Sequence, residues 1–235
     1  MPAARVALVT GGTRGIGEAV ARRLTAEGFA VFISGRTEDS VGKALARFAK
    51  EGLGVRGFAA DARREEDQQR LVESAARDGG RLDVLVNNAG IGHFAPVDQL
   101  DPEKFREVVE TNLFGPFYAI RHAAPLMKKT GGGFVVNIAS LASVNAFAGG
   151  AAYNASKFGL LGFSEAAMLD LRHDGIRMAT VLPGSVATEF GHARGDAAWM
   201  LAPEDVAEAV ADLVRFPGRA IASRIDLRPS RPPGK

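Results

Sequence analysis

The chain has 235 residues, of which 46% are hydrophobic and 24% are charged, enough to bury a substantial core in one α/β domain spanning 1–235. Its formal net charge of +2 is too small to indicate a nucleic-acid partner, which would need a concentrated basic face. The absence of cysteine excludes disulfides, thiolate metal sites and a cysteine nucleophile.

Targeting and membrane segments are not expected from the sequence. Met1–Ala4 lead directly into an apolar stretch, without the charged, apolar and cleavage regions of a signal peptide. No run of about 18 apolar residues occurs anywhere in the chain. We therefore expect a cytoplasmic protein with no membrane partner.

Short apolar runs alternate with longer amphipathic stretches along the whole chain. Such alternation is typical of βαβ units, in which helices cover both faces of a parallel sheet. Strands are predicted at Val6–Val9, Ala30–Ser34, Val55–Ala59, Val84–Asn87, Phe134–Ile138, Met178–Leu182 and Ile221–Leu227. Helices are predicted at Gly15–Ala26, Glu38–Glu51, Glu65–Asp78, Pro102–Lys129, Ala152–His173 and Pro203–Phe216. We therefore expect a doubly wound Rossmann fold with a seven-stranded parallel sheet.

A glycine cluster follows the first strand and opens the first helix. It contains Gly11, Gly12, Gly15 and Gly17. Glycine permits positive φ and close backbone approach, and a helix N-terminus offers free N–H groups to a pyrophosphate. A dinucleotide site is the favoured interpretation. An ordinary tight turn is the alternative, because the Gly-x-x-x-Gly-x-Gly spacing differs from the common fingerprint.

The choice of cofactor depends on what meets the adenosine ribose. An acid after the second strand would bind a 2′-hydroxyl, but the strand here ends at Gly35 and is followed by Arg36. Together with Arg14 in the glycine cluster, Arg36 could bracket a 2′-phosphate, which favours NADP(H) over NAD(H). The alternative is that both arginines are solvated surface groups. Asp61 could bind the adenine amine, or cap the helix that begins near Arg64.

A tyrosine and a lysine lie four residues apart at the start of a predicted helix. Tyr153 and Lys157 would share one helix face, with Cβ atoms about 5–6 Å apart. An ammonium about 4 Å from the phenol would favour phenolate by about 4 kcal/mol at an effective dielectric near 20, or roughly three pKa units. That would bring the pKa of Tyr153 close to neutral pH, where acid–base catalysis is most effective. A plain surface contact is the alternative.

Polar residues follow two central strands at the edge where open α/β sheets bind ligands. Ser140 closes the fifth strand and could hydrogen-bond a substrate carbonyl, or merely satisfy nearby backbone. Asn87-Asn88-Ala89-Gly90 follows the fourth strand. Short polar side chains and glycine there suit either a structural turn or a cofactor-facing edge.

Together these motifs resemble the short-chain dehydrogenase/reductase family, in its short single-domain branch. The resemblance runs from the first strand to the loop after the sixth. It rests on Thr10–Gly17, Asp61, Asn87–Gly90, Asn112, Ser140, Tyr153 with Lys157, and Pro183–Gly184. It implies an NADP-dependent oxidoreductase acting on CH–OH groups, which transfers a hydride between NADP(H) and a small-molecule carbonyl or alcohol substrate.

The resemblance also implies residue roles. Tyr153 would be the catalytic acid/base, Ser140 would orient the substrate oxygen, and Lys157 would also bind the nicotinamide ribose. Asn112 would hold a water at the end of a proton relay; without the resemblance it is a polar group inside a helix. The residues implied to contact the cofactor are Gly11, Thr13, Arg14, Gly15, Ile16, Gly17, Arg36, Asp61, Asn88, Ala89, Gly90, Tyr153, Lys157, Pro183, Gly184, Val186 and Thr188.

The resemblance further implies a homotetramer or homodimer, built through the helices that carry Asn112 and Tyr153. The segment 223–232 lacks the glycine-rich turn and final strand of many relatives. This departure weakens an assignment to the ketoacyl reductases of fatty-acid synthesis and leaves the second tetramer interface open. None of the four histidines has metal-ligand spacing, so we expect a metal-free mechanism.

The segment Ser185–Met200 is expected to form a flap over an open substrate pocket. Residues that could line the pocket, or be ordinary core or surface residues, are His93, Phe94, Leu141, Phe147 and Phe190. A catalytically silent NADP-binding sensor or structural protein is the competing hypothesis. Such a protein would be expected to lose Tyr153 or Lys157, and both are present. A longer sugar-nucleotide epimerase would need another glycine spacing and a larger C-terminal region.

Overall fold

A computed structural model describes residues 4–191 and 198–232, and its centre is a seven-stranded sheet. The strand order is β3-β2-β1-β4-β5-β6-β7, and every pairing is parallel. The strands are β1 (Val6–Val9), β2 (Ala30–Gly35), β3 (Arg56–Ala59), β4 (Val84–Asn87), β5 (Gly133–Ile138), β6 (Ile176–Pro183) and β7 (Arg224–Leu227). The predicted doubly wound sheet is confirmed.

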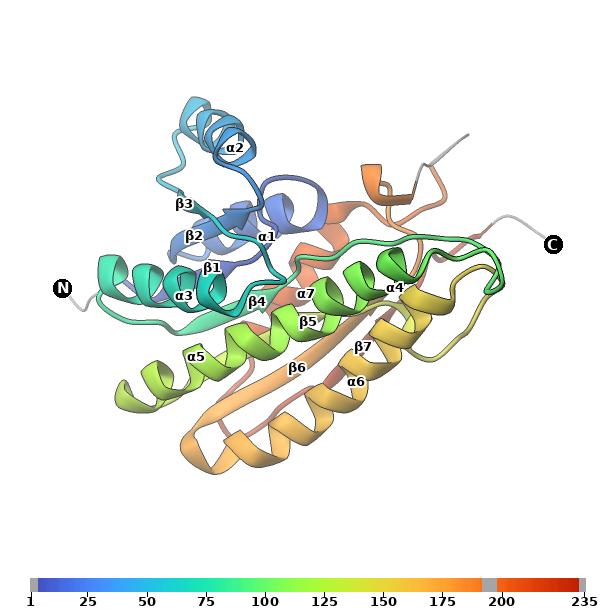
Figure 1. Ribbon diagram of the computed structural model, residues 1–235. Helices are drawn as coiled ribbons and strands as arrows, with labels where there is room; N and C mark the ends of the chain where they lie inside the picture. Colours follow the sequence, from blue (N-terminus) through green and yellow to red (C-terminus); the bar gives the residue numbers. More distant parts are fainter. Residues whose placement is uncertain (1–3, 192–197, 233–235) are drawn as a thin grey trace.

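Helices cover both faces of the sheet, as Figure 1 shows. They are α1 (Gly15–Ala26), α2 (Glu38–Lys50), α3 (Glu65–Gly79), α4 (Pro102–Val109), α5 (Gly115–Lys129), α6 (Ala151–Leu171) and α7 (Pro203–Arg215). One hydrophobic cluster joins α1, α2 and α7 to the sheet, and a second joins α3, α5 and α6 to its other face. The four residues of β1 are completely buried, because both faces are covered. Within the described ranges, no helix combines the length and hydrophobicity that a bilayer span requires.

The predicted helix at Pro102–Lys129 is not continuous α-helix. A π-helical segment, η1 (Glu110–Phe114), separates α4 from α5. Gly115 lies so close to the next layer that a Cβ there would be 3.0 Å from the Ala62 carbonyl oxygen. Periodicity does not reveal such a widened turn, which often marks a functional position in a helix.

The last strand is also shorter than predicted. It begins at Arg224 rather than Ile221, because pairing with β6 starts at Thr180 opposite Arg224.

Buried amides tie α6 to the centre of the sheet. The Asn87 Nδ2 donates to Asn137 Oδ1 at 2.8 Å, across β4 and β5. The Asn137 Nδ2 donates in turn to the Ser164 hydroxyl of α6, also at 2.8 Å. Because breaking such bonds in the core leaves unsatisfied polar groups, they set the position of α6 on the sheet. The first turn of the same helix carries Tyr153.

Candidate active site

The glycine cluster forms a tight turn between β1 and α1. Gly11 and Gly15 have φ values of +63° and +55°, a region that strongly favours glycine. A Cβ on Gly17 would lie 2.4 Å from both the Asn88 amide nitrogen and the Gly11 carbonyl oxygen. Among the described residues, no side chain caps the first turn of α1. The turn therefore leaves an open, electropositive helix N-terminus, which fits a phosphate group.

Hydrogen bonds join the glycine turn to the loop after β4. The Thr10 hydroxyl accepts from the backbone N–H groups of Asn88 at 3.0 Å and Ala89 at 3.1 Å. The Asn88 side chain donates to the carbonyl oxygens of Thr10 at 3.0 Å and Gly11 at 3.1 Å. The side chain of Asn88 therefore shapes the turn that would hold the cofactor.

Arg47 supports the turn from α2 and was not singled out from the sequence. Its guanidinium donates to the Thr13 carbonyl oxygen at 2.6 Å and pairs with Glu18 of α1 at 2.7 Å. No local motif distinguishes this arginine from others on an exposed helix face. Its contacts exist only because α2 packs beside the turn.

Arg14 and Arg36 occupy different electrostatic settings. Arg14 forms an exposed ion pair with Glu189, from the segment after β6. Arg36 is exposed, and no hydrogen bond or ion pair is recorded for it within the described ranges. The end of β2 lies against the glycine turn, since a Cβ on Gly35 would be 2.5 Å from the Thr13 methyl group. Both arginines thus follow segments that meet at one edge of the sheet.

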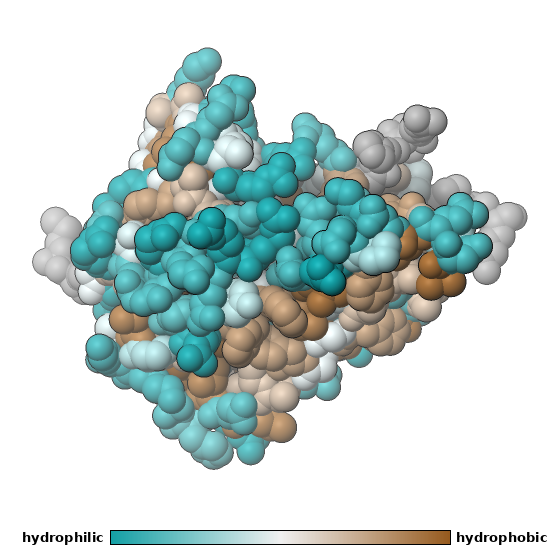
Figure 2. Space-filling view, viewed as in Figure 1, coloured by the Kyte–Doolittle hydropathy of each residue, from teal (hydrophilic) through white to brown (hydrophobic). Residues whose placement is uncertain are grey.

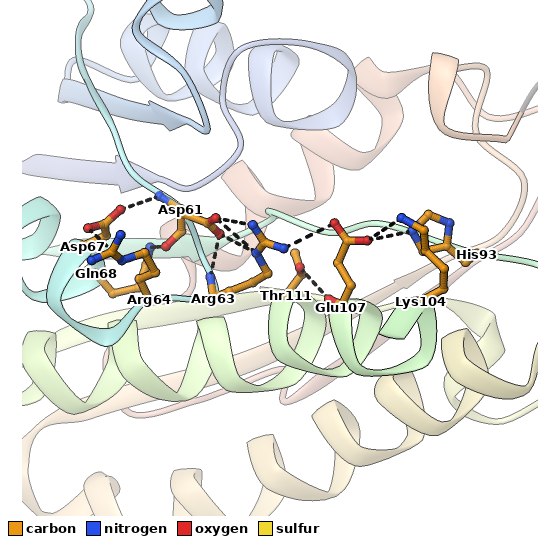
Figure 3. Close-up of polar contacts among 9 residues, drawn as sticks. All are labelled: Asp61, Arg63, Arg64, Asp67, Gln68, His93, Lys104, Glu107 and Thr111. Atoms are coloured by element: carbon orange, nitrogen blue, oxygen red, sulfur yellow. Dashed lines mark hydrogen bonds and ion pairs between the residues drawn. The ribbon is translucent and has the colours of Figure 1, made fainter. Parts of the chain in front are cut away.

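Asp61 begins a chain of charged contacts along the same edge, drawn in Figure 3. Its carboxylate binds the Arg63 guanidinium at 2.5 Å and accepts from the Arg63 backbone N–H at 3.0 Å. The hydrogen bond from Arg63 holds the pKa of Asp61 below its usual value, although burial opposes this. Arg63 also reaches Glu107, which lies 3.2 Å from the His93 ring. The carboxylate stabilises a turn, and it does not cap the first turn of α3.

Three polar groups meet at the carboxyl ends of β5 and β6. The Lys157 ammonium donates to the Ile138 carbonyl oxygen at 3.0 Å and lies 5.8 Å from the centre of the Tyr153 ring. The Ser140 hydroxyl accepts from the Ala142 backbone N–H at 3.1 Å and lies near enough to the Tyr153 phenol to affect its pKa. A Cβ on Gly90 would lie 3.7 Å from the Lys157 nitrogen, so the loop after β4 adjoins this group.

The ionisation of Tyr153 differs from the prediction. Burial raises the pKa of Tyr153, and the nearby Ser140 hydroxyl only partly opposes this. Burial also lowers the pKa of Lys157 from its ordinary 10.5 to about 8. The ammonium is 4% exposed and bonded to a backbone carbonyl, so it pays a desolvation cost of its own instead of acidifying the phenol. The phenol of Tyr153 is therefore protonated in this state.

Asn112 is fully buried in the π-helical segment and joins the loop after β4 to α6. Its Nδ2 donates to the Ile91 carbonyl oxygen at 2.9 Å and to the Ser156 hydroxyl at 3.0 Å. Its Oδ1 accepts from the Ile91 N–H at 2.8 Å. Through these bonds Asn112 links the loop after β4 to α6.

Asn154, beside the tyrosine, is another residue that the sequence did not single out. Its Nδ2 donates to the carbonyl oxygens of Ala142 at 2.8 Å and Asn145 at 3.1 Å. Its Oδ1 accepts from the Phe147 N–H at 3.3 Å. The contacts hold the loop that follows Ser140. The position between Tyr153 and Lys157 was the only sequence signal.

The segment after β6 crosses the glycine turn. The Gly184 N–H donates to Leu227 at 2.8 Å, and Val186 forms a parallel bridge with Leu201. A Cβ on Gly15 would lie 3.3 Å from the Thr188 methyl group. Of the predicted flap at 185–200, residues 192–197 lie outside the described residues.

The matched sequence and the observed geometry agree with one enzyme family. Residues 5–199 match the family described as short chain dehydrogenase. The chain belongs to the short-chain dehydrogenase family. An uncharacterized oxidoreductase, YxjF of Bacillus subtilis, is 37% identical over 186 residues, covering 79% of this chain and 72% of the relative.

Solved structures of short-chain dehydrogenases resemble this chain over nearly its whole length. An alcohol dehydrogenase from Thermococcus sibiricus, complexed with 5-hydroxy-NADP, superimposes with a TM-score of 0.88 at 28% identity, covering 98% of this chain and 99% of the other. A metagenomic short-chain oxidoreductase in complex with NADP gives 0.84 at 32% identity, covering 97% and 98%. Within the described part of this short-chain dehydrogenase, no cluster of three or more acidic or histidine side chains could hold a metal ion.

The buried lysine predicts an unusual pH dependence of stability. Unfolded Lys157 keeps its proton up to about pH 10.5, whereas the folded protein releases it near pH 8. Because the unfolded state binds more protons in this window, the free energy of unfolding should rise there, by at most about 1.4 kcal/mol per pH unit. Urea denaturation of the wild type and Lys157→Met should show this gain only in the wild type. Parallel pH profiles for the two proteins would contradict the assignment.

Proposed function

We propose that this short-chain dehydrogenase interconverts a carbonyl compound and an alcohol with NADP(H), using Tyr153 as general acid/base within one domain. The observation that carries the proposal is the convergence of the Tyr153 phenol, the Ser140 hydroxyl and the Lys157 ammonium beside Gly90. These groups lie at the carboxyl edge of a parallel sheet, next to a turn that fits a dinucleotide phosphate.

Ser140, Tyr153 and Lys157 would have different roles at the substrate oxygen. The Ser140 hydroxyl lies near enough to the Tyr153 phenol to affect its pKa, so both could contact an oxygen placed between them. Since burial keeps Tyr153 neutral, the phenol can give its proton to the oxygen as negative charge develops there. With a pKa of about 8, Lys157 is mainly charged at neutral pH and would bind the nicotinamide ribose beside the phenol.

The resemblance to short-chain dehydrogenases assigns the residues that would hold NADP(H). The diphosphate would bind the glycine turn at Gly11–Gly17, and Arg14 with Arg36 would bind the 2′-phosphate. Asp61 would face the adenine, and Lys157 the nicotinamide ribose. The remaining contacts would come from Ala89, Gly90, Pro183, Gly184, Val186 and Thr188. The bound nicotinamide supplies or accepts the hydride. The NADP complexes of the two similar structures support this cofactor.

Replacing the phenol tests the catalytic role directly. Tyr153→Phe removes the transferable proton while preserving the ring, and general acid–base catalysis contributes about 10²- to 10⁴-fold to rate. We expect turnover in a screen of NADPH with aldehydes, ketones, quinones and β-keto esters to fall by at least about 10²-fold. NADPH affinity, measured by fluorescence titration, should stay near that of the wild type. Turnover by the variant equal to that of the wild type would contradict the proposed mechanism. NADPH binding without turnover by the wild type would favour a catalytically silent NADP-binding protein.

Removing both arginines tests the choice of cofactor. The variant Arg14→Ala with Arg36→Ala loses the two cations assigned to the 2′-phosphate. Because hydrogen bonds to charged groups contribute about 1.5–3 kcal/mol each, the Kd for NADPH should rise by about tenfold or more. The Kd for NADH should change little. Arg77→Ala, which removes an exposed arginine from α3, serves as the control. Equal losses for both cofactors would refute the phosphate assignment.

We also propose that two copies associate through α5 and α6. Figure 2 shows hydrophobic side chains gathered where these helices face the viewer. Large apolar residues exposed on η1, α5 and α6 are Phe114, Phe117, Phe158 and Leu169. Such a surface is typical of a homodimer or homotetramer interface.

A charge placed on this surface should weaken the association. Phe158→Glu puts a carboxylate at an exposed position of α6, so burial against a second copy would cost several kcal/mol. Light scattering coupled to size exclusion should show a dimer or tetramer for the wild type and smaller species for the variant. Phe216→Glu, on the opposite side of the sheet, should leave the assembly intact. A monomeric wild type would overturn the proposal.

A further inference from the structure

Three phenylalanine rings form a cluster on one side of Tyr153. The ring centres of Phe94 and Phe190 each lie 5.7 Å from that of Tyr153, and Phe147 lies 5.9 Å from Phe94. The phenylalanines come from three different loops, which follow β4, β5 and β6. Phe94 is 50% exposed, Phe147 47% and Phe190 41%. We call these three residues the aromatic wall.

The rings can occupy these positions because the residues beside them are glycines. A Cβ on Gly92 would lie 2.6 Å from the Phe94 ring and 3.3 Å from the Phe190 ring. A Cβ on Gly150 would lie 2.6 Å from the Phe147 ring. The two loops are also joined, since the Ala95 N–H donates to the Gly149 carbonyl oxygen at 2.9 Å. The rings therefore occupy defined places although they are half exposed.

Two polar side chains near these rings, His93 and Asn154, bind groups other than the rings. His93 faces Glu107 at 3.2 Å, and Asn154 binds backbone groups of the loop after Ser140. In the described part of the chain, the only charged group recorded against the face of the Tyr153 ring is the Lys157 ammonium. The hydroxyls of Tyr153 and Ser140 are thus the polar groups available to a substrate, and apolar rings surround them.

We propose that the aromatic wall selects a substrate whose carbonyl carries an uncharged aromatic ring, such as an aryl ketone or aryl aldehyde. The inference rests on the proposed carbonyl reduction. The carbonyl oxygen would meet Tyr153 and Ser140, while the substrate ring covers the half-exposed phenylalanines. Aromatic contacts and burial of ring area favour such a ligand. A carboxylate on the ring would lose its hydration against the wall, and among the described residues no cation is recorded over the three phenylalanine rings.

Matched substrates test this selection. We would compare kcat/KM, with NADPH, for acetophenone, its para-carboxylate and butanone. Acetophenone should be preferred by about tenfold or more over each of the others, because the wall contributes only to the neutral ring. A preference for butanone or for the carboxylate would overturn the inference, while turnover that depends on Tyr153 would leave the proposed function standing.

Variants of the wall identify its contribution. Phe94→Ala and Phe190→Ala should each reduce kcat/KM for acetophenone about tenfold and leave that for butanone nearly unchanged. Phe216→Ala removes a phenylalanine of similar exposure, 42%, from the far side of the molecule and should change neither. Phe147→Leu is a more conservative substitution in the same wall. Its melting temperature, compared with that of the wild type, shows whether it folds normally. Equal losses for both substrates would assign the rings a purely structural role.

A binding measurement separates the two proposals. Calorimetry with Tyr153→Phe and NADP⁺ should show acetophenone binding that Phe94→Ala weakens, because the wall does not need the phenol. Binding of this kind supports the wall even where turnover is lost. An absence of turnover with every carbonyl by the wild type would overturn the proposed function, and the absence of acetophenone binding would overturn the wall alone.

Discussion

The hydrogen bonds between Thr10 and the Asn88–Ala89 backbone hold together the ends of β1 and β4, and the rest of the site depends on this junction. The strand order reverses there, since β1 lies between β2 and β4. The helices that follow the two strands diverge to opposite faces of the sheet, which leaves a crevice at the carboxyl edge. Because Asn88 also binds the carbonyls of the glycine turn, movement of either loop would disturb the other.

Amide side chains hold the loops around this crevice in a common way. The side-chain amides of Asn88, Asn112 and Asn154 each form hydrogen bonds with backbone groups of a neighbouring loop. An amide can donate and accept at the same time, so one side chain can satisfy several buried groups. Ser140 and Tyr153 therefore lie on a loop and a helix whose backbones are already fixed, which would lower the cost of ordering them around a substrate.

Burial has opposite consequences for the two titrating groups of the site. It raises the pKa of Tyr153 and lowers the pKa of Lys157, so both are driven towards their neutral forms. A neutral phenol is suited to donating a proton, whereas the charge on the lysine is retained only below about pH 8. The same apolar surroundings that produce these shifts include the phenylalanines of the aromatic wall.

The parallel sheet could be predicted from the order of residues alone, because apolar strands buried on both faces and amphipathic helices leave distinct local patterns. The sequence also determined which residues follow the strand ends, from Gly11 to Tyr153, since order along the chain places them at one edge. Only the tertiary structure decided the widened turn at Asn112, the contact of Arg47 with Thr13, and the pKa directions of Tyr153 and Lys157. Each of these depends on packing between segments far apart in sequence. Desolvation and through-space hydrogen bonds have no signature in the spacing of residues along a chain.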